Sequence, residues 1–279
     1  MLLVDGINRF IDLFLDTFRQ FGRGTVWLLL LAFFLVNWLV LYAHYNFTSP
    51  LFYTVVTGWV SLIGEGNKAA FTHYPAHLYY LSEYFGWAKF GVALIIEGLL
   101  LGAVARIFGR RFLAVHGGRP SGRSLLASWP HLVVVWLIIN VLIQLAGEYV
   151  PLWFEPLLSG PRRILAFTAV GMPCVFVLIL AVFFFAIPSI MVLGDGAVKA
   201  LGRSARIFIR NPLTCLFLAG FILALPVFFS VLSGYSPSII ERFNPGLVYW
   251  ILWASLASEV VANFFWMGTG VRFLAGHHE

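Results

Sequence analysis

Charge is scarce in this sequence. Asp, Glu, Lys and Arg make up 11% of the 279 residues, whereas soluble domains carry roughly 25%. None of these four residue types occurs over residues 24–64, 124–147, 164–194 or 211–240. Because roughly 20 apolar residues in a helix cross the hydrocarbon core of a bilayer, each stretch is long enough to span it. The lack of charge therefore excludes a soluble bundle and predicts an all-α integral membrane protein.

Reactive motifs are equally scarce. Cys174 and Cys215 are the two cysteines, and both lie in apolar stretches, so they indicate nothing about redox compartment. The sequence contains no HExxH, GxSxG or P-loop motif, which favours a protein that is not an enzyme. Residues 119–123 resemble part of a lipid-phosphatase motif but carry Arg123 where that motif has His. His73 and His77 are separated by Pro75, so we predict no metal or other cofactor.

Six membrane spans account for the apolar pattern. They are expected near residues 25–46, 84–105, 131–152, 164–192, 212–233 and 247–271, within a single transmembrane domain covering residues 1–279. With the N-terminus in the cytoplasm, thirteen Lys and Arg residues fall on the cytoplasmic side and five, including Lys89, on the other side. This positive-inside bias predicts that both termini are cytoplasmic.

Short amphipathic segments precede the odd-numbered spans. Residues 1–23 form a predicted cytoplasmic amphipathic helix, and residues 195–210 form a basic elbow helix that Asp195 can cap. A shorter elbow runs from Ser121 to Trp129 and is closed by Pro130. The pattern predicts three repeats, each an elbow helix followed by a transmembrane hairpin. Residues 48–83 form an outer segment with an interfacial helix between Leu51 and Gly64.

Polar residues inside the predicted spans are the first candidate site. Because a charge in hydrocarbon costs roughly 3 kcal/mol, they should face the bundle interior or water. The sequence places no Lys or Arg at comparable depth. Two interpretations remain open: a proton- or cation-coupled path, and hydrogen bonds that fix the helices together. The candidates are Glu97, Asn140, Gln144, Glu148, Glu259 and Asn263.

Four cations in the last elbow are the second candidate site. Lys199, Arg203, Arg206 and Arg210 are spaced by four, three and four residues, which places them along one helix face. They could bind anionic lipid headgroups or the acidic surface of a partner. The alternative is that they serve topology and form a solvated face.

The segment around this elbow carries a family resemblance. Over residues 183–218 the chain has Pro188, Asp195-Gly196, Ala200 and Arg203-Ser204 between two apolar stretches. This pattern resembles six-span bacterial membrane-protein families, including the membrane domain fused to some glycerophosphodiester phosphodiesterases. The sequence departs from them in having Asp195 where a Glu further upstream is more usual. The resemblance implies a six-span fold in the bacterial inner membrane, with no defined reaction.

Two functions follow from these observations. The first is a non-catalytic accessory or assembly subunit of a membrane complex, or a factor in membrane and lipid homeostasis. The alternative is a small permease or lipid transporter that uses the intramembrane acids and amides. The expected partners are anionic membrane lipids and other membrane subunits or a second copy of the chain. The basic pI of 9.5 is attributed to lipid attraction rather than to nucleic acid.

Overall fold

The computed structural model describes residues 2–63, 71, 76–115 and 124–276, and within these ranges the chain is helical and has no strand. Six helical stretches are long and apolar enough to cross a membrane, which confirms the predicted spans. The protein is an all-α polytopic bundle. The stretches are Gly24–Tyr45, His77–Ala114, Leu125–Leu157, Pro161–Leu193, Pro212–Gly234 and Leu247–Ala275.

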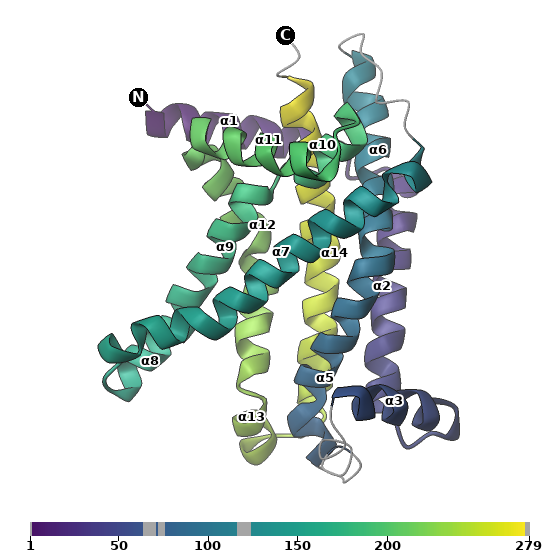
Figure 1. Ribbon diagram of the computed structural model, residues 1–279, viewed down its shortest axis with the longest axis vertical. Coiled ribbons are helices and arrows are strands. Elements are labelled where there is room, and N and C mark those ends of the chain that lie inside the picture. The colour runs from purple at the N-terminus through teal and green to yellow at the C-terminus, as the bar shows by residue number, and fades with distance from the viewer. Residues whose placement is uncertain (1, 64–70, 72–75, 116–123, 277–279) are drawn as a thin grey trace. The chain divides into compact units, whose positions relative to one another are not determined.

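Several of these stretches consist of more than one helix (Figure 1). The first half of the chain contains α1 (Leu2–Phe18), α2 (Gly24–Tyr45), α3 (Pro50–Ile63), α5 (Ala76–Val92), the π-helix η1 (Ala93–Glu97), α6 (Gly98–Val115) and α7 (Leu125–Phe154). The second half contains η2 (Glu155–Leu157), α8 (Pro161–Ala166), the π-helix η3 (Phe167–Gly171), α9 (Met172–Phe183), α10 (Ala186–Leu193), α11 (Ala197–Arg210), α12 (Pro212–Gly234), α13 (Ser236–Arg242) and α14 (Leu247–Ala275).

The chain divides into two compact units. The first contains Met1–Leu30, Leu94–Ala224 and Val261–Glu279, and the second contains Leu31–Ala93 and Leu225–Val260. The long helices α2, α12 and α14 contribute residues to both units. The single transmembrane domain expected from the sequence stays a prediction.

A break in span four organises the first unit. Between α9 and α10, the Phe185 amide donates to the Ser204 hydroxyl of α11 at 3.0 Å, and that hydroxyl donates to the Val182 carbonyl at 2.7 Å. The Trp266 indole of α14 donates to the Phe184 carbonyl at 2.8 Å. Side chains from two other helices therefore satisfy backbone groups that an unbroken helix would pair internally.

Among its described residues, the second unit contains two apolar clusters. One gathers buried residues of α2, α5, α13 and α14, among them Leu41, Leu81 and Leu256. The other contains Val56 and Val60 of α3, which confirms a helix between Leu51 and Gly64. Its interfacial position stays a prediction, and most of residues 64–75 of the predicted outer segment, His73 included, lie outside the described residues.

The predicted elbows are only partly present. The first and third exist as α1 and α11, but the second is not a separate helix. Ser124 caps α7, which continues through Pro130 to Phe154, so Pro130 does not close an elbow. Residues 116–123 lie outside the described residues, which leaves the Arg119–Arg123 motif without a structural account. A threefold repeat is not shown.

Candidate functional site

Helix α1 presents three different faces. Gly6, Leu13 and Thr17 are buried against the first unit. The approach is close: a Cβ atom at Gly6 would lie 3.3 Å from Leu213 Cβ, and one at Gly268 of α14 would overlap the Thr17 side chain. Ile11 and Leu15 are exposed on an apolar face, and acidic and basic residues occupy the third. This division fits a helix that contacts protein, lipid and water at once.

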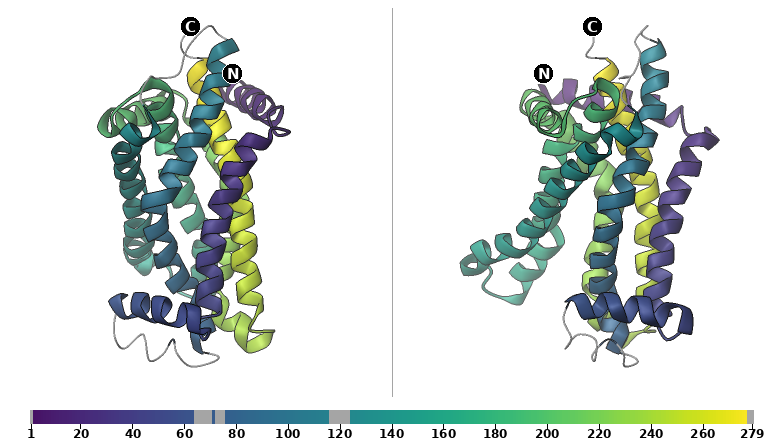
Figure 2. Two further views of the ribbon diagram at one scale, coloured as in Figure 1. Left: turned by 90° about the vertical axis from the view of Figure 1, so that its right-hand side faces the viewer. Right: turned by 45° about the vertical axis from the view of Figure 1, so that its right-hand side comes forward.

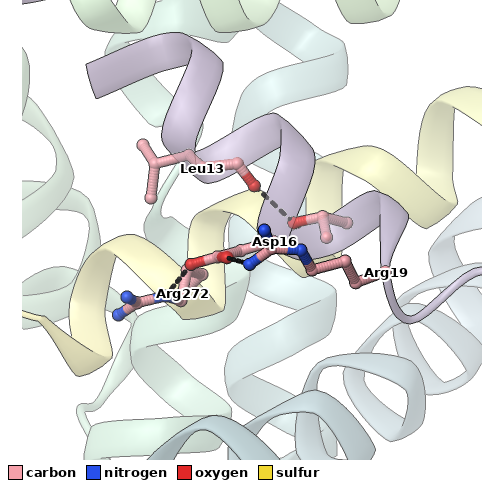
Figure 3. Close-up of polar contacts among 5 residues, drawn as sticks. Leu13, Asp16, Arg19 and Arg272 are labelled. Carbon is pink, nitrogen blue, oxygen red and sulfur yellow. Dashed lines mark hydrogen bonds and ion pairs between the residues drawn. The ribbon is translucent and has the colours of Figure 1, made fainter. Parts of the chain in front are cut away.

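A charged cavity of about 170 Å³ lies between α1 and the end of α14. Arg272 Nε is 2.8 Å from Asp16 Oδ2, and Arg19 Nη1 is 3.0 Å from Asp16 Oδ1 (Figure 3). Asp16 thereby accepts from two guanidinium groups and is fixed in position. The lining residues are Arg9, Asp12, Leu13, Asp16, Arg272, Phe273 and Gly276.

Arg9 anchors the same cavity. Its Nη1 donates to Asn211 Oδ1 at 2.9 Å, and its guanidinium carbon lies 4.4 Å from the centre of the Phe273 ring. Burial lowers the pKa of the Arg9 guanidinium. The group nevertheless keeps its charge, because arginine does not deprotonate in proteins. Arg9 therefore supplies a permanent positive charge to the cavity and connects α1 to the end of α11.

Helix α11 also has three faces, and both amphipathic helices lie across the same end of the first unit (Figure 2). Ala197, Ala200 and Ser204 are buried against the unit. Val198 and Ile209 are 84% and 76% exposed on a second face. The third face carries the four predicted cations, so the structure confirms that they share one side of the helix.

Asp195 divides that set of cations into two pairs. The Asp195 side chain is 1% exposed and lies 2.9 Å from Lys199 Nζ and 2.7 Å from Arg203 Nε. The predicted capping role is wrong, because Gly196 is the residue before the first turn and no side chain caps the helix. Asp195 instead neutralises the first two cations. Arg206 and Arg210 remain as the outward-facing pair.

An ion pair occurs inside the membrane-spanning part of the second unit. Lys89 Nζ lies 2.5 and 2.6 Å from the two carboxylate oxygens of Glu259, and the side chains are 24% and 21% exposed. The expectation that no cation lies at the depth of the acids is therefore wrong. Lys89 was counted on the outer side because it lies near the outer end of the predicted span 84–105, and its partner is 170 residues away in the sequence.

The Lys89–Glu259 pair could have been inferred from how far each residue lies from the start of its helix. Lys89 lies thirteen residues after the start of α5, and Glu259 lies twelve residues after the start of α14. At 1.5 Å per residue both are about 18–20 Å from the helix start, near the middle of a hydrocarbon core roughly 30 Å thick. Opposite charges at equal depth on two spans are expected to pair.

The other predicted polar residues have different surroundings. Glu97 is 4% exposed and ends the π-helix η1, and Asn263 is buried. Asn140 donates to the carbonyl of Trp136 on its own helix at 2.8 Å, while Gln144 and Glu148 are exposed. Neither exposed residue contributes to a polar interior. A shared polar interior formed by Glu97, Asn140 and Glu259 stays a prediction.

The η1 segment is a further feature that periodicity did not predict. A π-helix leaves carbonyl groups without their usual helical partner. The Trp129 indole of α7 donates to the Ile95 carbonyl of this segment at 3.1 Å. Gly98 then brings α6 close to α7, because a Cβ atom there would lie 3.3 Å from the Trp136 ring.

The six long apolar helices define the protein as an integral membrane protein of the all-α polytopic class. Comparison with protein-family models, with curated proteins and with solved structures finds no match for the chain.

Proposed function

We propose that this chain is a non-catalytic membrane protein that holds anionic phospholipid headgroups along α11, as an accessory or assembly subunit of a membrane complex or in lipid homeostasis. The three faces of α11 carry this proposal. One face is fixed to the protein by Ser204. The exposed Val198 and Ile209 can enter the apolar part of the bilayer, which holds the adjacent cations at headgroup level.

The location proposed with it is a bacterial inner membrane with both termini in the cytoplasm. When Lys89 is counted inside the membrane, four cations remain on the outer side and thirteen on the cytoplasmic side. This sharpens the positive-inside bias that supports the orientation. In this orientation α1 and α11 would lie at the cytoplasmic leaflet, where anionic lipids give the surface a negative potential.

Arg206 and Arg210 make the largest contribution to this binding. Neither makes an ion pair with any described residue, whereas Lys199 and Arg203 already neutralise Asp195. Each cation near an anionic surface is worth about 1 kcal/mol, so the two together correspond to about 30-fold in affinity. Arginine also binds phosphate through two parallel hydrogen bonds.

Native mass spectrometry of the purified protein with phosphatidylglycerol tests the proposal. The variant is Arg206→Gln with Arg210→Gln, and we expect about 30-fold weaker retention of the anionic lipid. The matched control is Arg162→Gln with Arg242→Gln, which removes two exposed cations outside the α11 face. Equal lipid retention by the α11 variant and the wild type would rule the proposal out.

The Lys89–Glu259 pair favours one alternative, a small permease or lipid transporter. An ion pair in the middle of a span is costly to maintain and is often part of a transport path. Replacing both residues, as Lys89→Gln with Glu259→Gln, removes both charges of the pair. If the pair carries transport, vesicles reconstituted with this double variant should show less proton flux across the membrane than vesicles with the wild type. Equal proton flux for the two proteins would exclude this alternative.

A further inference from the structure

The hairpin of spans three and four has little cover from the rest of its unit toward α8. Helices α7 and α9 pack against each other and are connected through α8 (Figure 1). The buried residues of α7 end at Ile139, and the next buried residue in the chain is Met172 of α9. Every residue from 140 to 171 is therefore at least partly exposed. In a membrane, these residues contact either lipid or another protein.

One side of α7 in this exposed part is polar near the middle of its span. Span three runs from Leu125 to Leu157, so its midpoint lies at residue 141. At 1.5 Å per residue, Gln144 and Glu148 are about 5 and 10 Å from that midpoint, inside a hydrocarbon core roughly 30 Å thick. Both side chains are exposed, and neither makes a hydrogen bond or ion pair with any described residue. Lipid tails offer no partner to such groups, so another membrane segment is needed to satisfy them.

The spacing of the residues on this side fits contact with a second helix. Leu137, Val141, Gln144 and Glu148 are all exposed and follow one another at intervals of four, three and four residues, which places them in one row along α7. Residues with this spacing meet across a pair of helices, and a polar residue in such a row fixes the register of the pair. The row lies on the opposite side of α7 from its buried residues, which are Ser128, Leu132, Val135 and Ile139.

The two polar side chains of the row are complementary to those of a second copy. The Gln144 amide has two N–H donors, and the Glu148 carboxyl group has acceptor oxygens. Across a two-fold axis each contact occurs twice, so Gln144 of each copy can donate to Glu148 of the other. Hydrogen bonds of this kind, made by polar residues within an otherwise apolar surface, hold membrane helices together.

We propose that the row of Leu137, Val141, Gln144 and Glu148 is the interface through which two copies of this chain associate in the membrane. The two α7 helices run in the same direction, because both copies have the same orientation in the bilayer. Association removes Gln144 and Glu148 from lipid, and the apolar residues of the row pack against their counterparts. This interface lies on a different helix from the cations of α11 and does not rest on the function proposed above.

Energy transfer between labelled copies in vesicles tests the interface. Full-length protein labelled with a donor or an acceptor at the N-terminus is reconstituted in phosphatidylethanolamine with phosphatidylglycerol, and energy transfer is followed as the protein is diluted in lipid. We expect the wild type to dimerise and Gln144→Leu to weaken the dimer about tenfold, because two hydrogen bonds between the helices are lost. Glu148→Gln keeps an acceptor for the amide of the other copy and should dimerise at least as well as the wild type. The control, Ser230→Leu, replaces an exposed polar residue of α12 and should dimerise as the wild type does.

Cysteine cross-linking locates the interface without depending on the strength of the dimer. In a background in which Cys174 and Cys215 are replaced by Ala, Val141→Cys should form a disulfide between copies, because residues of the row meet their counterparts. Leu225→Cys, exposed near the middle of span five, is the control and should not cross-link. A wild type that stays monomeric at every dilution would overturn the proposal and leave the row to a different membrane protein. Equal dimerisation of Gln144→Leu and the wild type, or equal cross-linking at the two cysteine positions, would also overturn it.

Discussion

Two sites in this chain each pair a carboxylate with a lysine, but their surroundings differ. Lys89 contacts both carboxylate oxygens of Glu259 near the middle of two spans, and each side chain is mostly buried. Asp195 sits at the start of α11 with its carboxylate buried, and two cations reach it from the surface. In the first site the Glu259 carboxylate has one cationic partner among the described residues, Lys89. In the second, the buried charge has two partners that can replace each other.

This difference determines how each site responds to the loss of a residue. A charge left alone in hydrocarbon has no water to compensate it, so removing Lys89 exposes the full cost of the Glu259 charge. At the membrane surface, the lost partner is replaced by water or by the second cation. Stability measurements on variants of both sites therefore test the comparison directly.

The largest effect is expected for Lys89→Met. The substitution leaves the Glu259 carboxylate without its partner, and we expect a loss of about 3 kcal/mol in the free energy of unfolding. Denaturant titration of the protein in bicelles provides the measurement. The double variant Lys89→Met with Glu259→Gln should recover part of the loss, because the Glu259 side chain is then uncharged. A double variant that is less stable than Lys89→Met would contradict this account.

The next effect in size is expected for Asp195→Asn. The substitution removes the charge that holds Lys199 and Arg203, and hydrogen bonds to charged groups are worth about 2 kcal/mol. We expect a loss of that order in the same titration. Glu241→Gln, which changes an exposed acid of α13, is the control and should lie within about 0.5 kcal/mol of the wild type. Equal stability of the two variants would show that the Asp195 pairs do not stabilise the fold.

The features that depend on local pattern could be predicted from the sequence. Long uncharged stretches indicate spans whatever they pack against, and the spacing of Lys199 and Arg210 alone places both on one face of α11. The features that depend on distant residues could not. The Lys89–Glu259 pair joins spans two and six, and it follows only once the start of each helix is known, which the residues around Lys89 do not give.

Two predictions made from neighbouring residues in the sequence were wrong: the helix cap at Asp195 and the helix end at Pro130. Asp before a helix predicts a cap, but Lys199 and Arg203 lie one and two turns later and attract the carboxylate away from the backbone. Pro130 predicts a helix end, yet α7 continues through it. A proline costs a helix one hydrogen bond, and a membrane bundle can tolerate that loss where neighbouring groups satisfy the freed carbonyl.

Ser204→Ala measures what an uncharged contact contributes at the same surface. The hydroxyl accepts from the Phe185 amide and donates to the Val182 carbonyl at the break in span four. Its removal leaves a buried amide without a partner, and we expect a loss of about 1 kcal/mol. The control is Ser233→Ala, whose hydroxyl bonds the Ser230 carbonyl in an exposed position. If Ser233→Ala lowers the free energy of unfolding as much as Ser204→Ala does, the hydrogen bonds of Ser204 at the break do not stabilise the fold more than an ordinary exposed hydroxyl does.

Lys199→Met should have the smallest effect and completes the comparison with Lys89→Met. Both substitutions remove a lysine from an ion pair, but the Lys199 side chain is 70% exposed. Asp195 keeps Arg203 at 2.7 Å after the change, so no buried charge is left alone. An exposed pair contributes about 0.5 kcal/mol or less, and the loss should also shrink with added salt. Bicelle titrations at two salt concentrations check both expectations. A salt-independent loss similar to that of Lys89→Met would show that the membrane surroundings do not account for the difference between the two sites.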